Sequence, residues 1–296
     1  MKKILMLAIV MTMSCFANAV DFSDMAKDIN FKNLMTSEAL SKGYVEGNIP
    51  EVEPAFVPIN WVFISGGKFQ MGTDSLNWWG HFEDAYPVHE VTIKSFYMSK
   101  TEVTVEQYAE CVDALECMPP ETGDSCNWEK PRLKHHPVNC VGWFRASQYA
   151  EFKGARLPSE SEWEYAATSK GKNQKYPWGN DNPTCKTTVM KENGVKGCGL
   201  NSTMPVCSKS AGNTEQGLCD MAGNVTEWVQ DRYQVSYDGA PCDGSAAENT
   251  GYKRATAVLR GGSFGSDVKR LRADYRDDDY QGWGLTVYGF RLAKSY

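Results

Sequence analysis

The chain is short of histidine, of basic charge and of long apolar runs. Four histidines occur in 296 residues, and none is spaced i, i+4 from another, as paired metal ligands on a helix are. The formal net charge of −6 offers no basic surface to nucleic acid or to an anionic membrane. Beyond the N-terminus, no apolar run approaches the length that crosses a bilayer. We therefore expect a globular protein that binds no nucleic acid and has no transmembrane segment in its mature form.

The N-terminus has the organisation of a signal peptide. Two lysines precede an apolar run over residues 4–13, and the small-residue sequence Ala17-Asn18-Ala19 follows it. We predict cleavage after Ala19, which makes residues 1–19 a signal peptide and the mature protein periplasmic or secreted. Lipid anchoring at Cys15 is the alternative, but the three residues before it match a lipoprotein signal poorly.

Cysteine is plentiful in the middle of the chain and absent from its end. Because cleavage of the signal peptide leaves nine cysteines, at least one has no partner within the chain. In an oxidising compartment, cysteines in loop-rich sequence form disulfides. Their spacing suits pairing within residues 111–140 and within residues 185–242, although the sequence does not assign it. The absence of any CxxC motif disfavours a metal site. The nine are Cys111, Cys117, Cys126, Cys140, Cys185, Cys198, Cys207, Cys219 and Cys242.

Apolar patterning divides the mature chain into an N-terminal extension, residues 20–58, and one domain, residues 59–296. Two apolar runs on either side of a Gly-Gly pair predict a hairpin over residues 61–72. Residues 89–98 alternate between polar and apolar side chains and predict a third strand. The sequence from 169 to 256 is rich in Gly, Asn, Pro, Ser and Cys, so we expect loops held by disulfides or metal ions.

Helical spacing and capping signals predict three helices. They cover residues 104–115, 146–153 and 159–168, with Thr104 and Ser159 as caps of the first and third.

Charged side chains in two places have a structural interpretation. In the third helix we expect Trp163 to be buried while Glu160 and Glu164 face water. Near the C-terminus, the aspartates at 274 and 277–279 are candidate ion-pair partners of Arg260, Arg272, Arg276 and Arg291.

Six sequence blocks occur in an order and spacing that are specific when taken together. They are FISGGKFQMGTD, HEVTIKSFYMSKTEVTVEQYAECV, HPVNCVGWFRASQYAEFKGARLPSESEWEYAA, YPWGN, GLCDMAGNVTEWVQDRY, and VLRGGSF with GFRLA. They resemble the formylglycine-generating enzyme (sulfatase-modifying factor) family over nearly all of residues 61–296. The resemblance implies an α+β, compact C-type-lectin-like fold with little regular secondary structure, which often holds calcium and which the cysteines would staple here.

The stretch from Asp220 to Glu227 has the composition of a calcium site. Calcium prefers several oxygen ligands, which carboxylates and the freed carbonyls of a glycine turn supply. In the family, the matching positions bind a structural calcium ion through the side chains of Asp220 and Glu227 and through the carbonyls of Gly223 and Val225. The alternative is a Gly-Asn turn with solvated acidic groups.

The zone after the RGGS motif is where oxidase members of the family carry two cysteines, five residues apart, that form a copper site. This chain has Ser263, Ser266, Asp267 and Leu271 there. Hydroxyl and carboxylate groups do not replace thiolates around Cu(I), so we expect no copper site. The spacing of the histidines likewise disfavours the three-histidine iron site of related sulfoxide synthases.

Two functions follow from the resemblance. In ligand-binding relatives, the side chains between RGGS and GFR surround a shallow pocket. Aromatic rings on rigid loops bury much area at small entropic cost, although core packing is the alternative role of the same rings. We favour a domain that binds a protein, peptide or glycan; the alternative is a formylglycine-generating-type oxidoreductase that acts on an exported substrate. The candidate ligand-binding residues are Ser266, Asp267, Tyr275, Arg276, Asp278, Tyr280 and Trp283.

Overall fold

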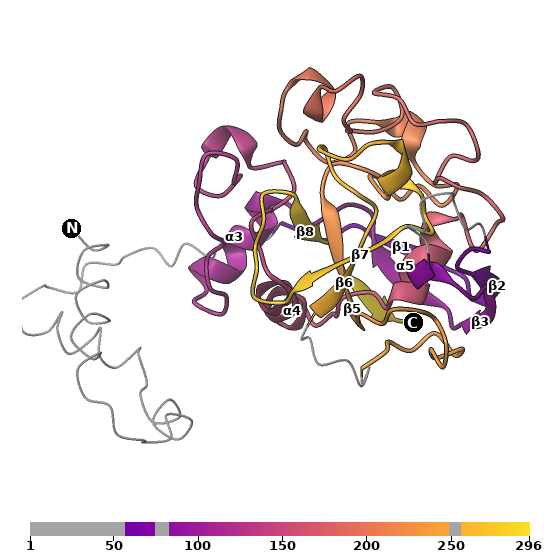
Figure 1. The fold of residues 1–296 in the computed structure, drawn as a ribbon. Coiled ribbons are helices and arrows are strands. Elements are labelled where there is room, and N and C mark those ends of the chain that lie inside the picture. The colour runs from indigo at the N-terminus through magenta and orange to yellow at the C-terminus, as the bar shows by residue number, and fades with distance from the viewer. Residues whose placement is uncertain (1–56, 75–82, 249–255) are drawn as a thin grey trace, which may run out of the picture. The chain divides into compact units, whose positions relative to one another are not determined.

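The computed structural model describes residues 57–74, 83–248 and 256–296. The predicted signal peptide, almost all of the predicted extension and His81 lie outside these ranges. From Pro54 to Tyr296 the chain forms one compact unit. Its described residues combine three α-helices with nine short strands, so the predicted α+β class with few regular elements is confirmed (Figure 1). Among these residues, no helix is long and apolar enough to span a membrane.

The first half of the domain contains an antiparallel ribbon that bends once. Its strands are β1 (Trp61–Ile64), β2 (Gly67–Met71), β3 (His89–Ile93) and β4 (Phe96–Ser99). β1 pairs with β4 and β2 pairs with β3 in one continuous register. The hairpin predicted over residues 61–72 is therefore wrong, because its two strands exist but pair with different partners. β9 (Ala293–Ser295) adds a third strand beside β4.

Close packing at Gly66 explains the bend. The Gly66 N–H donates to Ser95 Oγ at 3.0 Å. A Cβ added to Gly66 would lie 2.3 Å from the Ile93 carbonyl oxygen, so a larger residue cannot fit without moving the backbone. The strand predicted over residues 89–98 is divided at the same place into β3 and β4.

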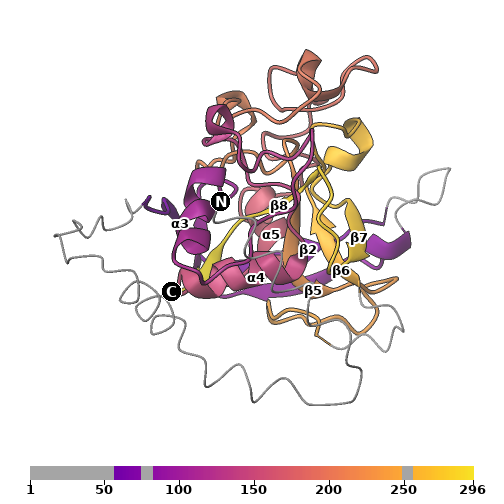
Figure 2. The same cartoon turned by 90° about the vertical axis from the view of Figure 1, so that its left-hand side faces the viewer.

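A four-stranded sheet in the order β7-β6-β5-β8 forms the second half (Figures 1 and 2). Its strands are β5 (Thr226–Arg232), β6 (Thr256–Arg260), β7 (Arg276–Tyr280) and β8 (Tyr288–Phe290). β8 is parallel to β5, and the other neighbours are antiparallel. The register of β6 and β7 places Arg260 directly opposite Arg276. Two cationic side chains therefore meet at this end of the sheet.

Three α-helices are present in the described ranges: α3 (Val105–Asp113), α4 (Trp143–Phe152) and α5 (Glu160–Ala167). The predicted caps are confirmed, because Thr104 and Ser159 each form a reciprocal capping box with the third helical residue. All eight residues of α5 are buried. The prediction that Glu160 and Glu164 face water is therefore wrong; both lie against arginines of the second sheet.

Four disulfides staple the irregular segments: Cys111–Cys117, Cys126–Cys140, Cys185–Cys198 and Cys207–Cys219. They agree with the two predicted groups of cysteines. Cys242 is the free cysteine of the described residues and is exposed. Short 3-10 helices lie in other connections: η2 (Glu83–Ala85), η3 (Pro131–Leu133), η4 (Lys196–Gly199), η5 (Ser210–Gly212) and η6 (Val268–Leu271).

Trp163 and Trp228 lie in the two main apolar clusters of the core, and both side chains are fully buried. Each indole N–H has a partner, as a buried polar group requires. Trp163 donates to the Glu227 carboxylate at 2.8 Å, and Trp228 donates to the Val141 carbonyl at 2.9 Å. Trp163 thus connects the apolar core to the buried carboxylate of Glu227.

The bend at Gly66 gives a test of this packing. Gly66→Ala should destabilise the protein by about 3 kcal/mol, because the new methyl group meets backbone atoms that cannot move freely. Gly282→Ala is the matched control, since an added Cβ there meets nothing within 4 Å; we expect a change within about 0.5 kcal/mol. Chemical unfolding measures both free energies, and equal losses would refute this explanation of the bend.

Candidate functional site

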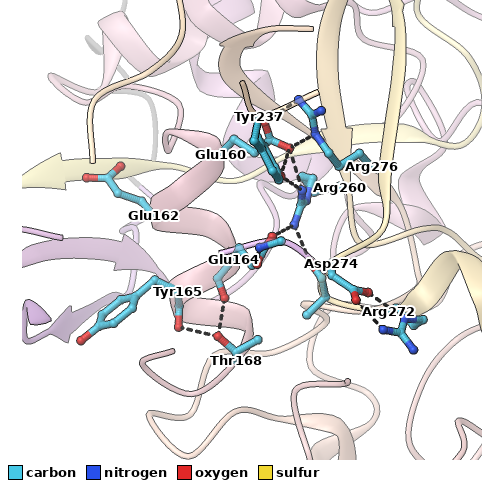
Figure 3. A network of polar contacts seen from close by, with 12 residues as sticks. Glu160, Glu162, Glu164, Tyr165, Thr168, Tyr237, Arg260, Arg272, Asp274 and Arg276 are labelled. Atoms are coloured by element: carbon cyan, nitrogen blue, oxygen red, sulfur yellow. Dashed lines mark hydrogen bonds and ion pairs between the residues drawn. The ribbon is translucent and has the colours of Figure 1, made fainter. Parts of the chain in front are cut away.

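A buried carboxylate joins α5 to both arginines of the sheet (Figure 3). Glu160 Oε1 accepts a hydrogen bond from Arg260 Nη1 at 2.6 Å and one from Arg276 Nε at 2.7 Å. Glu160 Oε2 accepts from Arg276 Nη2 at 3.0 Å, and the Tyr237 hydroxyl donates to Oε1 at 3.1 Å. Arg260 also pairs with Glu164 on the next turn of α5. One helix therefore neutralises the two cations that face each other across the β6–β7 pair.

The electrostatics of Glu160 favour its ionised form. Burial alone raises the pKa of this carboxyl, but attraction by Arg276 and Arg260 and their hydrogen bonds outweigh burial and hold its pKa below its ordinary value of 4.5. Burial alone would lower the pKa of Arg276. Attraction by Glu160 outweighs burial, so the pKa of Arg276 is raised above its ordinary value. Both groups stay charged over the physiological range.

Arg276 is enclosed on its other sides as well. Its Nη1 donates to the carbonyl oxygens of Gln234, at 2.8 Å, and of Asp84. The ring of Tyr237 lies 4.4 Å from the guanidinium carbon. Arg276 is only 4% exposed, so a ligand could reach it only by displacing protein groups. This burial favours a structural role for Arg276, and its predicted contact with a ligand stays a prediction.

The other predicted ligand residues occupy three kinds of position. Ser266 is buried, and its Oγ accepts the Ser263 N–H at 2.9 Å, which gives it a turn-forming role. Asp267 is exposed and caps η6. Tyr275 is half-buried beneath the guanidinium of Arg270, 5.9 Å from its ring centre.

Tyr280 and Trp283 are brought together at the end of β7. Their side chains are 42% and 53% exposed, and their ring centres lie 5.0 Å apart. Asp278 precedes them on β7 and is half-buried. We call Asp278, Tyr280 and Trp283 the C-terminal face.

The backbone beneath the C-terminal face is fixed by the first half of the chain. Gln281, which lies between Tyr280 and Trp283 in the sequence, is buried. A Cβ added to Gly284 would lie 2.5 Å from the Cys140 carbonyl oxygen, and the Cys140 N–H donates to the Leu285 carbonyl at 3.2 Å. Cys140 is itself held by the disulfide to Cys126. The exposed rings therefore project from a closely packed turn.

The predicted calcium residues lie in a separate buried acidic cluster. Glu227 forms a bidentate pair with Arg291, with both N–O distances at 2.7 Å. Glu102 belongs to the same cluster and was missed in the sequence, because no local pattern links it to a segment more than a hundred residues away. It accepts the Val225 N–H at 3.1 Å, and burial followed by repulsion from Asp220 and Glu227 raises its pKa.

Carboxylates outnumber cations in this cluster. Three carboxylates, Glu102, Asp220 and Glu227, face one cation, Arg291, which leaves two negative charges uncompensated when all are ionised. Burial is the main reason that the pKa of Asp220 rises to about 6. Within the described residues, however, no three acidic, histidine or cysteine side chains are gathered closely enough to hold a metal alone. The carbonyls of Gly223 and Val225 would have to complete the set.

Free thiols are scarce in the part of the chain that the structure describes. Eight of its nine cysteines form the four disulfides, which leaves Cys242. After RGGS, Ser266 and Leu271 are both buried. These described residues therefore offer no pair of thiols for a soft metal ion.

Short strands, buried arginine pairs and stapled loops define a C-type-lectin-like domain of the sulfatase-modifying type. Residues 50–296 match the family model described as "Sulfatase-modifying factor enzyme 1-like domain", and the chain belongs to this family.

Relatives in the family carry different names. The serine/threonine-protein kinase pkn1 of Chlamydia caviae is 33% identical over 91% of this chain, which spans 44% of the relative's length. The inactive C-alpha-formylglycine-generating enzyme 2 of Bos taurus is 32% identical and is matched over 60% of this chain and 72% of its own. Among solved structures, PvdO from Pseudomonas aeruginosa superposes with a TM-score of 0.67 at 28% identity, over 80% of this chain and 94% of that one.

The ion pairs of Glu160 predict a specific pH dependence of stability. Because the folded-state pKa of Glu160 is depressed, its contribution is fully present above about pH 4.5 and is lost as the pH falls through the folded-state value. Glu160→Gln should cost about 3–5 kcal/mol near neutral pH, since two buried arginines lose their anion. The variant should also lose less stability than the wild type between about pH 5 and pH 3.

Chemical unfolding at several pH values provides this measurement. Glu162→Gln is the control on the same helix, because Glu162 pairs with Arg156, whose side chain is 32% exposed. Parallel pH profiles for Glu160→Gln and the wild type would show that the predicted linkage is absent.

Proposed function

We propose that this protein is an exported ligand-binding domain that recognises a protein, peptide or glycan through its C-terminal face. The observation that carries the proposal is the exposed pair of rings, Tyr280 and Trp283, on a turn packed against Cys140. Rigid aromatic side chains gain contact area without a large entropic cost, which is why such rings dominate binding surfaces. Asp278 adds an acidic group beside them. The disulfides suit an oxidising compartment outside the cytoplasm.

The oxidoreductase alternative rests on the family resemblance, and the side chains present do not support it. A copper thiolate site needs two cysteines. The zone after RGGS holds instead the buried Ser266, whose Oγ accepts a hydrogen bond from the Ser263 N–H. Arg276, at the start of β7, is ion-paired with Glu160. Ser266 and Arg276 therefore stabilise the fold at positions where an oxidase would need reactive side chains.

We also propose a structural calcium ion held by Asp220 and Glu227 with the carbonyls of Gly223 and Val225, and with Glu102 nearby. The support is the uncompensated negative charge of the buried cluster, which a divalent cation would balance. The ion would stabilise the start of β5 and would take no part in ligand contact.

The C-terminal face can be tested with defined ligand collections. The wild type should select binders from a random dodecapeptide phage library or a printed glycan array, and Trp283→Ala should weaken them about tenfold or more, as loss of a central aromatic contact does. Phe63→Ala is the control, because Phe63 is a 46% exposed ring on β1. Unfolding free energies confirm that both variants stay folded. Selected ligands that bind Trp283→Ala as well as the wild type would contradict the proposal.

The oxidase alternative makes its own prediction. Purified protein incubated with copper, oxygen and a Cys-x-Pro-x-Arg peptide should leave the peptide thiol intact, because no described thiol pair can bind the metal. Mass spectrometry measures the product. Oxygen-dependent conversion of the cysteine would overturn the assignment as a binding domain only.

Calcium is tested by thermal unfolding after chelation. Returning calcium to the chelated protein should raise the melting temperature by several degrees, because a ligand present at about a hundred times its Kd adds about 2.7 kcal/mol. Asp220→Ala should abolish this response, whereas Asp181→Ala, which removes an exposed acid, should retain it. An unchanged melting temperature in the wild type would refute the ion.

A further inference from the structure

An open groove of about 1000 Å³ lies beside β2 and the C-terminal end of α5. Its lining includes Arg272, Asp274, Glu164 and Thr168, which Figure 3 labels. Residues 171–175 also line it. Neither Tyr280 nor Trp283 lines this groove, so it is a different surface from the C-terminal face. We call it the polar groove.

Polar side chains dominate the lining of the polar groove, and their charges balance. Four cationic, four acidic and four amide side chains line it, against two apolar ones, Phe69 and Val88. A groove that selects anions carries an excess of cations, and a peptide groove offers apolar pockets for side chains. This lining therefore fits neither an anionic ligand nor a peptide.

The charges of the polar groove are largely paired within the protein. Lys68 bonds to Glu90 at 2.7 Å across the β2–β3 pair. Arg272 Nε donates to Asp274 at 2.7 Å, and a second bond makes this pair bidentate. Glu164, at the base, accepts the Gly72 N–H at 2.8 Å and pairs with Arg260. Because these charges are paired with neighbouring groups, the groove does not present a strong net charge.

Two amides of the polar groove are held in a fixed orientation. Gln174 Nε2 donates to the carbonyl oxygens of Tyr176 and Pro177, at 3.0 and 3.1 Å, which leaves its Oε1 as an acceptor. Asn180 Oδ1 accepts the Lys175 N–H at 3.0 Å, which leaves its Nδ2 as a donor. The groove thus carries one amide with a fixed acceptor and one with a fixed donor.

We propose that the polar groove binds a neutral oligosaccharide. A sugar hydroxyl both donates and accepts, so it can bond to oriented amides and to paired charges at the same time. The volume lies at the upper end of ligand sites, which suits a chain of several sugar rings better than one ring. This site is independent of the C-terminal face and goes beyond the function proposed for that face.

The test uses linear neutral hexasaccharides, namely maltohexaose, cellohexaose and chitohexaose, with the full purified protein. At least one should show saturation transfer in NMR and a measurable Kd by calorimetry. Asn180→Asp keeps the acceptor for the Lys175 N–H but replaces the donor, so it should weaken binding about tenfold, a loss of about 1.4 kcal/mol. Trp283→Ala should leave the affinity unchanged.

Three results would overturn this proposal. The first is the absence of saturation transfer from all three sugars at millimolar concentration. The second is a hyaluronan hexasaccharide or hexalysine that binds while the neutral sugars do not. The third is a neutral sugar that binds Asn180→Asp as tightly as the wild type; if Trp283→Ala then abolishes that binding, the sugar belongs to the C-terminal face and supports that proposal alone.

Discussion

The structure depends on one carboxylate, that of Glu160, placed between two arginines that face each other across neighbouring strands. Like charges directly opposite in a sheet repel, so Arg260 and Arg276 can share this register only with an anion between them. Burial of such ions is costly unless every charge is paired and hydrogen-bonded. The capped, wholly buried α5 supplies that pairing and so fixes the register of β6 and β7.

The buried ion pairs of Glu160 lie apart from the two surfaces proposed to bind ligands. The side chain of Arg276 points into the scaffold, while Tyr280 and Trp283 at the other end of β7 are exposed. Arg272 and Asp274 precede the same strand and form a wall of the polar groove. Both proposed binding surfaces are therefore anchored to the same buried ion pairs. The proposed recognition through these surfaces is consistent with a fold that hosts several functions.

The sequence predicted both helix caps and the grouping of the cysteines, because those features are encoded in local patterns. The fold class came from the family resemblance. The predicted pairing of the first two strands was wrong, and so was the predicted exposure of Glu160 and Glu164 to water. Charges near a helix start usually interact with the helix end and with water, so these acids were assigned to water. Their actual partners lie about a hundred residues away in the sequence. Glu102 and the polar groove were missed for the same reason. The calcium ligands and the exposed rings came from the family resemblance, and their roles stay predictions.

Hydrogen exchange at the backbone amides of β7 tests the central claim most directly. If the ion pairs of Glu160 hold this strand as a rigid support, its sheet-bonded amides in the wild type should exchange only through near-global unfolding. In Arg276→Met they should exchange far faster, while the amides of β1 and β4 change only as much as global stability does. Rapid exchange of β7 in the wild type, or uniform changes across the domain in the variant, would contradict the account.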